Sequence, residues 1–474
     1  MKVVQLLYSY LLTRDEFKIE QAPDANATAD RRFAYMLYLD LMLLVLELSG
    51  QRVQDEELVG VKLCGDNKFL SRSSLARALG ATDELRSVIV RHQSTIEKFN
   101  DVLPALLHAI EKSSVYLEKS GVRRKLDLRE EADFWAMTVS NVIARTPEFV
   151  EAARSIDGFT LAGLNMAVEM AVATIHSYRD NKEMLAGASR ALEKSLDKAY
   201  ELYHSLLLLS VELTEMQAQR LDAARHKYLP SPEDLTPNMR FVENQFVEQL
   251  SKNQQLAEYI KANPISWVDD DITMRRLLDA IISSDIYMEY MSRPTTDYKT
   301  DCEFWKNIYR NVIFPSDVLA EAMEEKSVFW NDDLEIMSTF VLKTVKQFSA
   351  STNGGADVKL LPQYKDEIDE VFGATLFEKA VENRELYRSY IDRFINTKQW
   401  DTDRLAFMDI VIMTTAIAEL LNFPGIPVAV TLNEYIEIAN SYSTPRSGQF
   451  VNGVLYSVIN YLKEEQILDK PIAK

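Results

Sequence analysis

The residues that could carry out chemistry in this chain are its abundant carboxylates, its two cysteines and its five histidines. A metal site needs several Cys, His or acidic ligands on one face, which on a helix means a spacing of three or four residues. Only background pairs such as Glu201 with His204 have this spacing, and any acidic chain produces such pairs. The histidines all lie in the middle of the chain: His92, His108, His176, His204 and His226. We therefore predict that the protein has no metal site.

The sequence also lacks the short motifs that build catalytic sites. It contains no Walker-type phosphate loop, no G-x-G-x-x-G fingerprint and no G-x-S-x-G nucleophile elbow. Paired carboxylates could act as a general acid and base, but they would need a pocket that the sequence does not reveal. We predict no catalytic residues and no cofactor, and an enzyme is the weaker alternative.

Composition describes a large acidic helical protein. The chain has 474 residues, of which 47% are hydrophobic, enough for two to four domains with buried cores. Only 14 glycines and 14 prolines indicate long helices and few turns. The net charge of −19 repels phosphate backbones. Any nucleic-acid binding must therefore be local or must be assembled with a basic partner.

The cysteines and the apolar segments indicate a cytoplasmic protein. Cys64 and Cys302 lie far apart and cannot form a disulfide framework, which suits a reducing compartment. The apolar start is interrupted by polar residues and is followed by T-R-D-E, so it is not expected to be a signal peptide. The most apolar run, 41–46, is far shorter than the ~20 residues that span a bilayer. We predict no membrane association.

Two helices joined by a proline-containing loop are predicted near the end of the chain, over 428–439 and around 450–455. Thr431 and Glu434 have the T-x-x-E spacing of a capping box, in which each side chain satisfies a free amide at a helix start. Gly453 stands where alanine would be the better helix former, which indicates close packing against another helix.

This pair of helices resembles the NusB family of transcription antitermination factors. The resemblance rests on N-E-x-x-E-x-A (433–439) followed by S-x-x-F-V-N-G-V-L (447–455), with further similar segments upstream between 376 and 420. At the other end of the chain, V-Q-L-L-Y-S-Y (4–10) is similar to the first helix of that family. The resemblance implies one small helical domain formed by residues 1–14 and 371–466. The long region between them implies a long form of the family with a large helical insertion.

The resemblance implies that the protein binds boxA, a short single-stranded RNA element of nascent transcripts. In the family, the RNA surface combines the basic start of the first helix with the loop before the F-V-N-G helix. Cations, polar groups and aromatic rings are the groups that hold single strands, and a helix start offers free amides to phosphate. Two of the matching positions, Tyr8 and Phe450, suit a core equally well. The matching positions are Lys2, Gln5, Tyr8, Arg446, Ser447, Gln449, Phe450 and Asn452.

The resemblance also implies a protein partner, the small-subunit ribosomal protein that doubles as Nus factor E, and through it the RNA polymerase antitermination complex. The matching positions are Tyr10 on the first helix and Asp409 on the helix that the W-x-x-D-R-L segment (400–405) begins. Asp409 is expected at an exposed position, as a partner contact or as an ordinary solvated residue. Relatives carry several basic residues before V-Q-x-L-Y, and this chain has only Lys2. Weaker RNA binding or a start upstream of Met1 would explain the difference, and Arg446 would partly compensate.

The central region contains an internal duplication. The pattern A-Y-x-L-Y-x-x-L-x-L-L-x-x-E-L at 34–48 recurs at 199–213, an offset of 165. A second block begins with Phe-Trp at 134–135 and recurs at 304–305, an offset of 170, with 10 of 45 positions identical. Apolar residues at helical spacing bury one face, and large aromatic pairs fill a core. We predict two tandem helical bundles with Trp135 and Trp305 in equivalent buried places.

These observations predict an all-α protein with four parts. The first helix of a NusB-like domain lies in 1–20, repeat 1 in 31–180, repeat 2 in 196–350 and the C-terminal NusB-like domain in 360–474. The leading hypothesis is a bacterial antitermination factor that supports ribosomal RNA transcription. The alternative is an acidic protein-interaction scaffold that keeps the fold without RNA binding. An RNA methyltransferase with a NusB-like domain is disfavoured, because nothing here resembles a cofactor-binding α/β domain.

Overall fold

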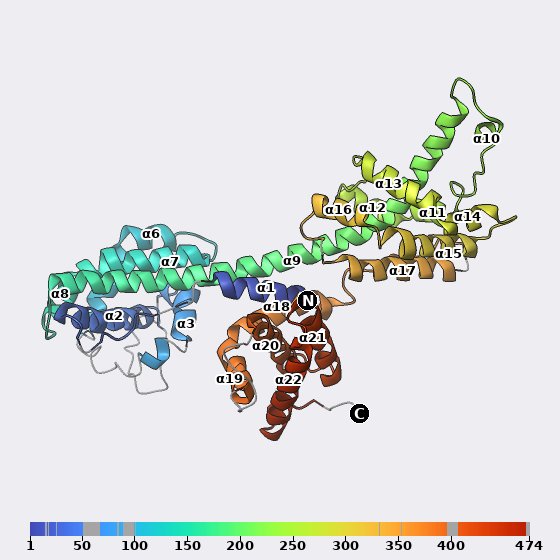
Figure 1. Cartoon of the computed structure of the whole chain (residues 1–474). Helices are drawn as coiled ribbons and strands as arrows, with labels where there is room; N and C mark the ends of the chain where they lie inside the picture. Colours follow the sequence, from blue (N-terminus) through green and yellow to red (C-terminus); the bar gives the residue numbers. More distant parts are fainter. Residues whose placement is uncertain are drawn as a thin grey trace. The chain divides into compact units, whose positions relative to one another are not determined.

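A computed structural model of the chain describes residues 1–14, 17, 19–24, 26–50, 67–82, 85–88, 99, 101–330, 332–351, 353–395 and 406–470. Within these ranges the protein is all-α, as predicted, and contains no strand (Figure 1). Cys64, His92 and the W-x-x-D-R-L segment lie outside the described residues. The chain divides into two compact units, Tyr10–Ala188 and a second unit formed by Met1–Ser9 with Ser189–Lys474.

The unit Tyr10–Ala188 contains repeat 1, which is built around the buried helix α2. Fourteen of the twenty residues of α2 are buried, because its sequence is apolar on nearly all sides. Gly163 allows α9 to approach α2 closely, since a Cβ atom there would lie 2.6 Å from Phe33 Cδ1. The elements of this unit are α2 (Ala29–Leu48), η1 (Leu70–Arg72), α3 (Ser74–Gly80), α5 (Leu103–Lys112), α6 (Ser114–Ser120), α7 (Leu128–Met137), η3 (Thr138–Val142), η4 (Ile143–Arg145), α8 (Pro147–Arg154) and the first part of α9 (Leu161–Arg225).

The other unit contains repeat 2 and the C-terminal helices. Repeat 2 has its own core, in which α15 packs against α11 and α17. Its elements are the second part of α9, α10 (Pro232–Leu235), α11 (Gln245–Ser251), α12 (Gln254–Ala262), α13 (Asp271–Ile282), α14 (Asp285–Ser292), α15 (Tyr298–Ile308), η5 (Tyr309–Ile313), α16 (Asp317–Lys326) and α17 (Leu334–Ala350).

The same order of elements occurs in both repeats. In repeat 1, α7 runs into the π-helical turn η3 and is followed by α8 and α9. In repeat 2, α15 runs into the π-helical turn η5 and is followed by α16 and α17. Trp135 in α7 and Trp305 in α15 are both fully buried. A π turn is rare enough that its recurrence after the same Phe-Trp pair supports the predicted duplication.

A hydrogen bond recurs at the two predicted offsets. The Tyr38 hydroxyl lies 3.0 Å from Thr174 Oγ1 in repeat 1, and the Tyr203 hydroxyl lies 2.7 Å from Thr344 Oγ1 in repeat 2. The tyrosines are 165 residues apart and the threonines are 170 apart, as the two sequence blocks are. Each bundle therefore has its own buried polar contact of the same kind, which joins its first helix to its last helix.

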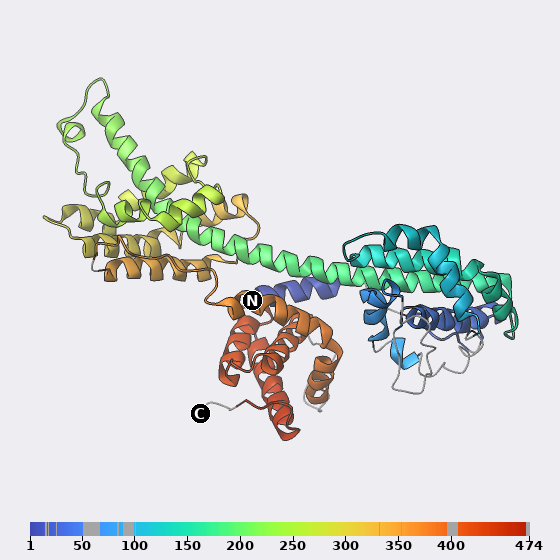
Figure 2. The same ribbon diagram turned by 180° about the vertical axis from the view of Figure 1, so that it is seen from behind.

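Four C-terminal helices pack around α20. The stretch from Val411 to Leu420 is buried at every position, and α20 contacts the four other helices of the bundle. The bundle is orange to red in Figure 1, and Figure 2 shows it from the opposite side. Its helices are α18 (Glu367–Glu382), α19 (Arg384–Ile395), α20 (Phe407–Asn422), α21 (Val428–Tyr442) and α22 (Ser447–Glu464).

Two local predictions for this bundle are wrong. Thr431 does not begin a helix with a capping box, because α21 begins three residues earlier at Val428. The buried Thr431 hydroxyl instead donates to Glu419 Oε1 at 2.7 Å, so a tertiary contact uses the side chain. Gly453 is exposed and would have nothing within 4 Å of a Cβ atom, so close helix packing does not explain it.

The first nine residues belong to the same unit as the C-terminal helices. Helix α1 (Lys2–Thr13) begins in this unit, where Val3 and Val4 are buried. A Cβ atom at Gly373 of α18 would lie 3.8 Å from Val3 Cγ2, so the two helices touch at these positions. An isolated helix of this length would be marginal in water, and this apolar contact stabilises it.

Candidate nucleic-acid interface

The polar residues at the start of α1 are bonded to two acidic residues of repeat 2. Lys2 Nζ lies 2.8 Å from Asp333 Oδ2 and 2.9 Å from Ser195 Oγ. One turn later, Gln5 Nε2 donates to Asp332 Oδ2 at 2.8 Å. The Asp333 side chain is only 4% exposed and that of Lys2 is 17% exposed. Burial raises the pKa of Asp333, and the Lys2 ammonium opposes that rise.

Tyr8 connects α1 with the start of α20. Its ring centroid lies 5.3 Å from that of Phe407, and the ring planes are tilted by 53°. Tyr8 is half-buried and Phe407 is 37% exposed, so the pair forms an aromatic surface that is still open to solvent. Such a surface is suited to stacking with an unpaired base.

Asp409 fixes the loop between α21 and α22. Ser443 Oγ donates to Asp409 Oδ1 at 2.6 Å, and Ser447 Oγ donates to Asp409 Oδ2 at 3.0 Å. Asp409 is 5% exposed and Ser447 is 1% exposed. The expectation that Asp409 lies at an exposed helix position is therefore wrong. The physical reason is that its carboxylate accepts two serine hydroxyls from a loop about 35 residues later in the chain.

The start of α22 presents the exposed part of the predicted RNA surface. Arg446, Gln449 and Asn452 are exposed, whereas Ser447 and Phe450 are buried. The first turn of α22 contains no acidic residue and no side chain caps it. The positive end of the helix dipole thus lies beside the exposed Arg446 guanidinium, an arrangement that favours an anion.

The structure connects the two predicted halves of the surface through α20. Tyr8 touches Phe407 at the start of α20, and Asp409 two residues later holds Ser447 at the start of α22. Tyr10, the other predicted partner contact, is 4% exposed and lies in the unit Tyr10–Ala188. Both predicted partner positions are therefore buried in this structure.

The acidic residues before α17 are the feature that the sequence patterns did not reveal. Asp332, Asp333 and Glu335 all act on Tyr442 at the end of α21, whose pKa is raised first by burial and then by these carboxylates. In sequence, D-D-L-E before a helix has the form of an ordinary acidic first turn. No local signal shows that it faces α1 and the end of α21.

The described residues contain no cluster of three or more His, Cys, Asp or Glu side chains that could hold a metal ion. Among the helices of the same residues, none is both long enough and apolar enough to cross a bilayer. The groups on the predicted surface are those of a binding site. They are the exposed Arg446 guanidinium, the side-chain amides of Gln449 and Asn452, the start of α22 and the Tyr8–Phe407 aromatic pair.

Comparison with known proteins identifies the bundle that carries this surface. A model of the NusB family matches residues 334–460. Transcription antitermination protein NusB of Salinibacter ruber (strain DSM 13855 / M31) is 33% identical over 135 residues, which cover 27% of this chain and 82% of that protein. The chain belongs to the NusB family.

Other NusB proteins show similar agreement. Transcription antitermination protein NusB of Methylacidiphilum infernorum (isolate V4) is 34% identical over 123 residues, covering 25% of this chain and 85% of that protein. The protein of the same name from Dictyoglomus thermophilum is 36% identical over 99 residues, which cover 21% of this chain and 67% of that protein. No solved structure gives a significant match. NusB proteins are transcription factors and not enzymes, in agreement with the prediction from the sequence.

The family match ends at residue 460, before the predicted domain end at 474, and the two differ more at their starts. The match begins at residue 334, the first residue of α17, whereas the predicted NusB-like domain begins at 360. In the structure, α17 contributes Val341, Val345 and Phe348 to the core of repeat 2. The NusB family match does not include residues 1–333, which hold α1, repeat 1 and most of repeat 2.

Proposed function

We propose that this NusB-family protein is a transcription antitermination factor that binds boxA-like single-stranded RNA together with a small-subunit ribosomal protein, Nus factor E. It would act in the cytoplasm as part of an RNA polymerase antitermination complex and support ribosomal RNA transcription. The observation that carries the proposal is the family match over the bundle that contains α20 and α22.

The geometry of the bundle supports RNA binding by a small number of contacts. Arg446 and the uncapped start of α22 suit a phosphate, Gln449 and Asn452 suit base edges, and the Tyr8 ring suits stacking. Arg446 is the one exposed cation among the predicted RNA-binding residues, because Lys2 is paired with Asp333. A basic protein partner would supply the positive charge that this surface lacks.

Fluorescence anisotropy of a labelled boxA-like RNA, with and without the ribosomal protein, tests the proposal. Arg446→Glu should weaken binding and reduce the dependence of log K on log salt by about 0.7, the contribution of one phosphate contact in a single strand. Arg310→Glu is the matched control, because Arg310 is an exposed arginine of repeat 2. Equal affinity for boxA-like and scrambled RNA, unaffected by the partner or by Arg446→Glu, would reject RNA recognition.

One observation favours the alternative of a protein-interaction scaffold. The two polar residues of α1 that the family resemblance assigns to RNA, Lys2 and Gln5, are bonded to Asp333 and Asp332. A phosphate placed there would meet carboxylates and not a free ammonium group. The scaffold hypothesis predicts that the ribosomal protein binds normally, and that RNA does not bind with or without that partner. The same titrations distinguish the scaffold hypothesis from RNA recognition.

A further inference from the structure

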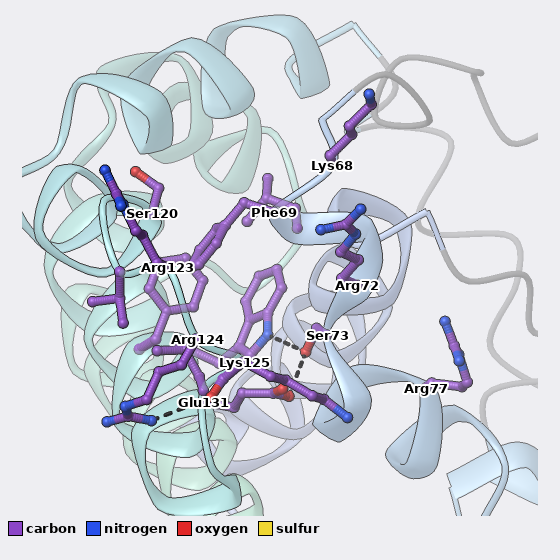
Figure 3. A pocket seen from close by; sticks show the side chains of 15 residues that line it. Lys68, Phe69, Arg72, Ser73, Arg77, Ser120, Arg123, Arg124, Lys125 and Glu131 are labelled. Atoms are coloured by element: carbon purple, nitrogen blue, oxygen red, sulfur yellow. Dashed lines mark hydrogen bonds between the residues drawn. The ribbon is translucent and has the colours of Figure 1, made fainter.

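Repeat 1 contains a pocket of about 600 Å³ whose lining is strongly basic (Figure 3). Its walls come from three segments: residues 68–77, which hold η1 and most of α3, residues 120–126, which join α6 to α7, and residues 131–135 of α7. Six exposed basic side chains line it: Lys68, Arg72, Arg77, Arg123, Arg124 and Lys125. The last three are the only run of three consecutive basic residues in a sequence of net charge −19.

Most of this positive charge is not neutralised by residues that the structure describes. Among those residues, Glu131 is the only acidic one that lines the pocket, and it is buried, where it accepts hydrogen bonds from Ser73 Oγ and the Leu75 amide at the start of α3. Arg124 makes two hydrogen bonds to Glu130, of 2.7 and 2.6 Å. The other five cations form no ion pair with any residue that the structure describes. Such a cluster is unfavourable unless it serves to attract an anion.

In repeat 2, a tyrosine lies beside the carboxylate that corresponds to Glu131. Asp301, which corresponds to Glu131, accepts from the Gln245 amide at the start of α11, at 2.9 Å. The Tyr290 ring stacks on Phe304 with a centroid distance of 4.0 Å, and its hydroxyl donates to Asp301 Oδ1 at 2.7 Å. The space beside the buried carboxylate is thus filled by a tyrosine that satisfies it.

Repeat 1 has no tyrosine at the corresponding position. The helices α6 and α14 begin at equivalent N-caps, Ser113 and Ser284, and each serine accepts from the amide three residues later. Counted from these caps, Tyr290 corresponds to Lys119, whose flexible side chain does not line the pocket. The pocket is therefore a space that repeat 2 fills and repeat 1 leaves open.

Most of the cations of the pocket are also specific to repeat 1. Counted from the N-caps of α3 and α11, Arg72 corresponds to Glu243 and Arg77 to Glu248. Counted from the N-caps of α7 and α15, the R-R-K run 123–125 corresponds to R-P-T at 293–295. Repeat 2 keeps a cation only at Arg293, the counterpart of Arg123, and folds with acidic or neutral residues at the other four positions, so packing of the bundle does not require most of the cations.

We propose that this pocket of repeat 1 binds a nucleoside polyphosphate, with the phosphate chain between Arg72 and Arg123 and the base against Phe69. A volume of about 600 Å³ is in the range of small-molecule sites. Cations on two walls contact consecutive phosphates at once, and guanidinium groups bind phosphate with two parallel hydrogen bonds. Phe69 lines the same pocket and is half-buried, so part of its ring is available to a base. A single RNA strand would instead be expected to follow an extended basic groove.

Isothermal titration of the full chain with ATP, GTP, inorganic triphosphate and adenosine tests this proposal. EDTA is included so that the measured binding reflects the basic side chains and not a metal ion. ATP or GTP should bind with one site per chain and more tightly than triphosphate, and adenosine should not bind. The double variant R72Q/R123Q should weaken nucleotide binding at least tenfold.

The matched control is R275Q/R276Q, which removes two exposed arginines from α13 of repeat 2. This variant should leave the nucleotide affinity within twofold of the parent protein. Circular dichroism melts of both variants should show unchanged folding, since all four side chains are exposed.

Four results would overturn the proposal. The first is the absence of binding by either nucleotide at millimolar concentration. The second is an equal loss of affinity in the two double variants, which indicates non-specific attraction. The third is triphosphate binding as tightly as ATP and GTP, which leaves no contribution from the base. The fourth is binding of a ten-nucleotide RNA without a terminal phosphate that displaces ATP and is lost in R72Q/R123Q, which makes the pocket an RNA surface.

Discussion

The Lys2 ammonium lies 2.8 Å from the Asp333 carboxylate, although 331 residues separate the two in the sequence. The pair joins the start of α1 to the segment that precedes α17, and Gln5 with Asp332 repeats the contact one turn later. A cation that relatives would present to RNA is thus held by the protein itself. In the proposed RNA complex, the acidic segment would compete with phosphate for this part of the surface.

Neutralising the acidic segment should therefore strengthen RNA binding. In D332N/D333N, the Lys2 ammonium loses its carboxylate partner and two negative charges leave the surface. A unit charge about 4 Å from a phosphate contributes about 1 kcal/mol in water, so we expect affinity for boxA-like RNA to rise roughly fivefold to thirtyfold. Fluorescence anisotropy measures the change. The control E324Q/E325Q removes two exposed charges from α16 and should have a smaller effect. Unchanged or weaker binding in D332N/D333N would contradict competition at α1.

Substitution of Asp409 should destabilise the C-terminal bundle. Asp409→Lys would bury an ammonium group and leave the hydroxyls of Ser443 and Ser447 without their acceptor. We expect a loss of about 3–5 kcal/mol in the free energy of unfolding, measured by urea denaturation. Asp409→Asn keeps one acceptor and should cost about 1 kcal/mol. Glu378→Lys, at an exposed position of α18, is the control and should stay within about 0.5 kcal/mol of the parent.

The recurring tyrosine–threonine contact predicts similar mutational effects in the two repeats. Tyr38→Phe removes the hydrogen bond to Thr174 and the acceptor of the Glu20 backbone amide. Tyr203→Phe removes the bond to Thr344 and the acceptor of the Leu361 amide, 3.2 Å away. Each substitution should lower the unfolding free energy of its repeat by about 1–2 kcal/mol. Hydrogen exchange of the two repeats measures both losses, and a negligible effect at either tyrosine would argue against equivalent structural roles.

His204 should make repeat 2 less stable in acid. Burial lowers the pKa of His204 from 6.5 to about 4, and its ring stacks on Tyr259 at 3.6 Å. The unfolded chain therefore binds a proton more readily than the folded chain between these two values. Stability from this residue is complete above pH 6.5 and is lost as the pH falls toward 4, by about 3 kcal/mol in total. His204→Phe should flatten the dependence of unfolding free energy on pH in that range. Urea denaturation at pH 7, 6, 5 and 4 measures this dependence. If His204→Phe leaves the change of unfolding free energy with pH unaltered, another group is responsible for it.

The sequence was sufficient to predict features that depend on apolar pattern. The helical class follows from periodic apolar residues with few glycines, and the burial of Trp135 and Trp305 follows from their place in a repeated Phe-Trp pair. The NusB family was recognisable because its motifs occur in order at fixed spacing. These features are encoded in short segments, where neighbours in the sequence are also neighbours in space.

The wrong predictions concern polar side chains whose partners are distant in the sequence. Thr431 has the spacing of a capping residue, but Glu419 on another helix takes its hydroxyl. Asp409 has the pattern of a solvated helix position, but a later loop supplies two donors. Lys2 was predicted to contact RNA, a role that remains untested, and the sequence did not indicate its ion pair with Asp333. Periodicity shows which side of a helix is apolar, and it does not show which buried polar groups will meet.

The two repeats have separate hydrophobic cores, one in residues 33–178 and the other in residues 199–360. A substitution in one core consequently leaves the packing of the other intact, so one copy retains its scaffold while the other accumulates changes. The contrast between Tyr290 and Lys119 has the form expected of such divergence. In the predicted duplication, one copy would have the residue that completes its interior and the other would have a basic opening. Duplication would then have provided the freedom from purifying selection in which a new binding role could evolve.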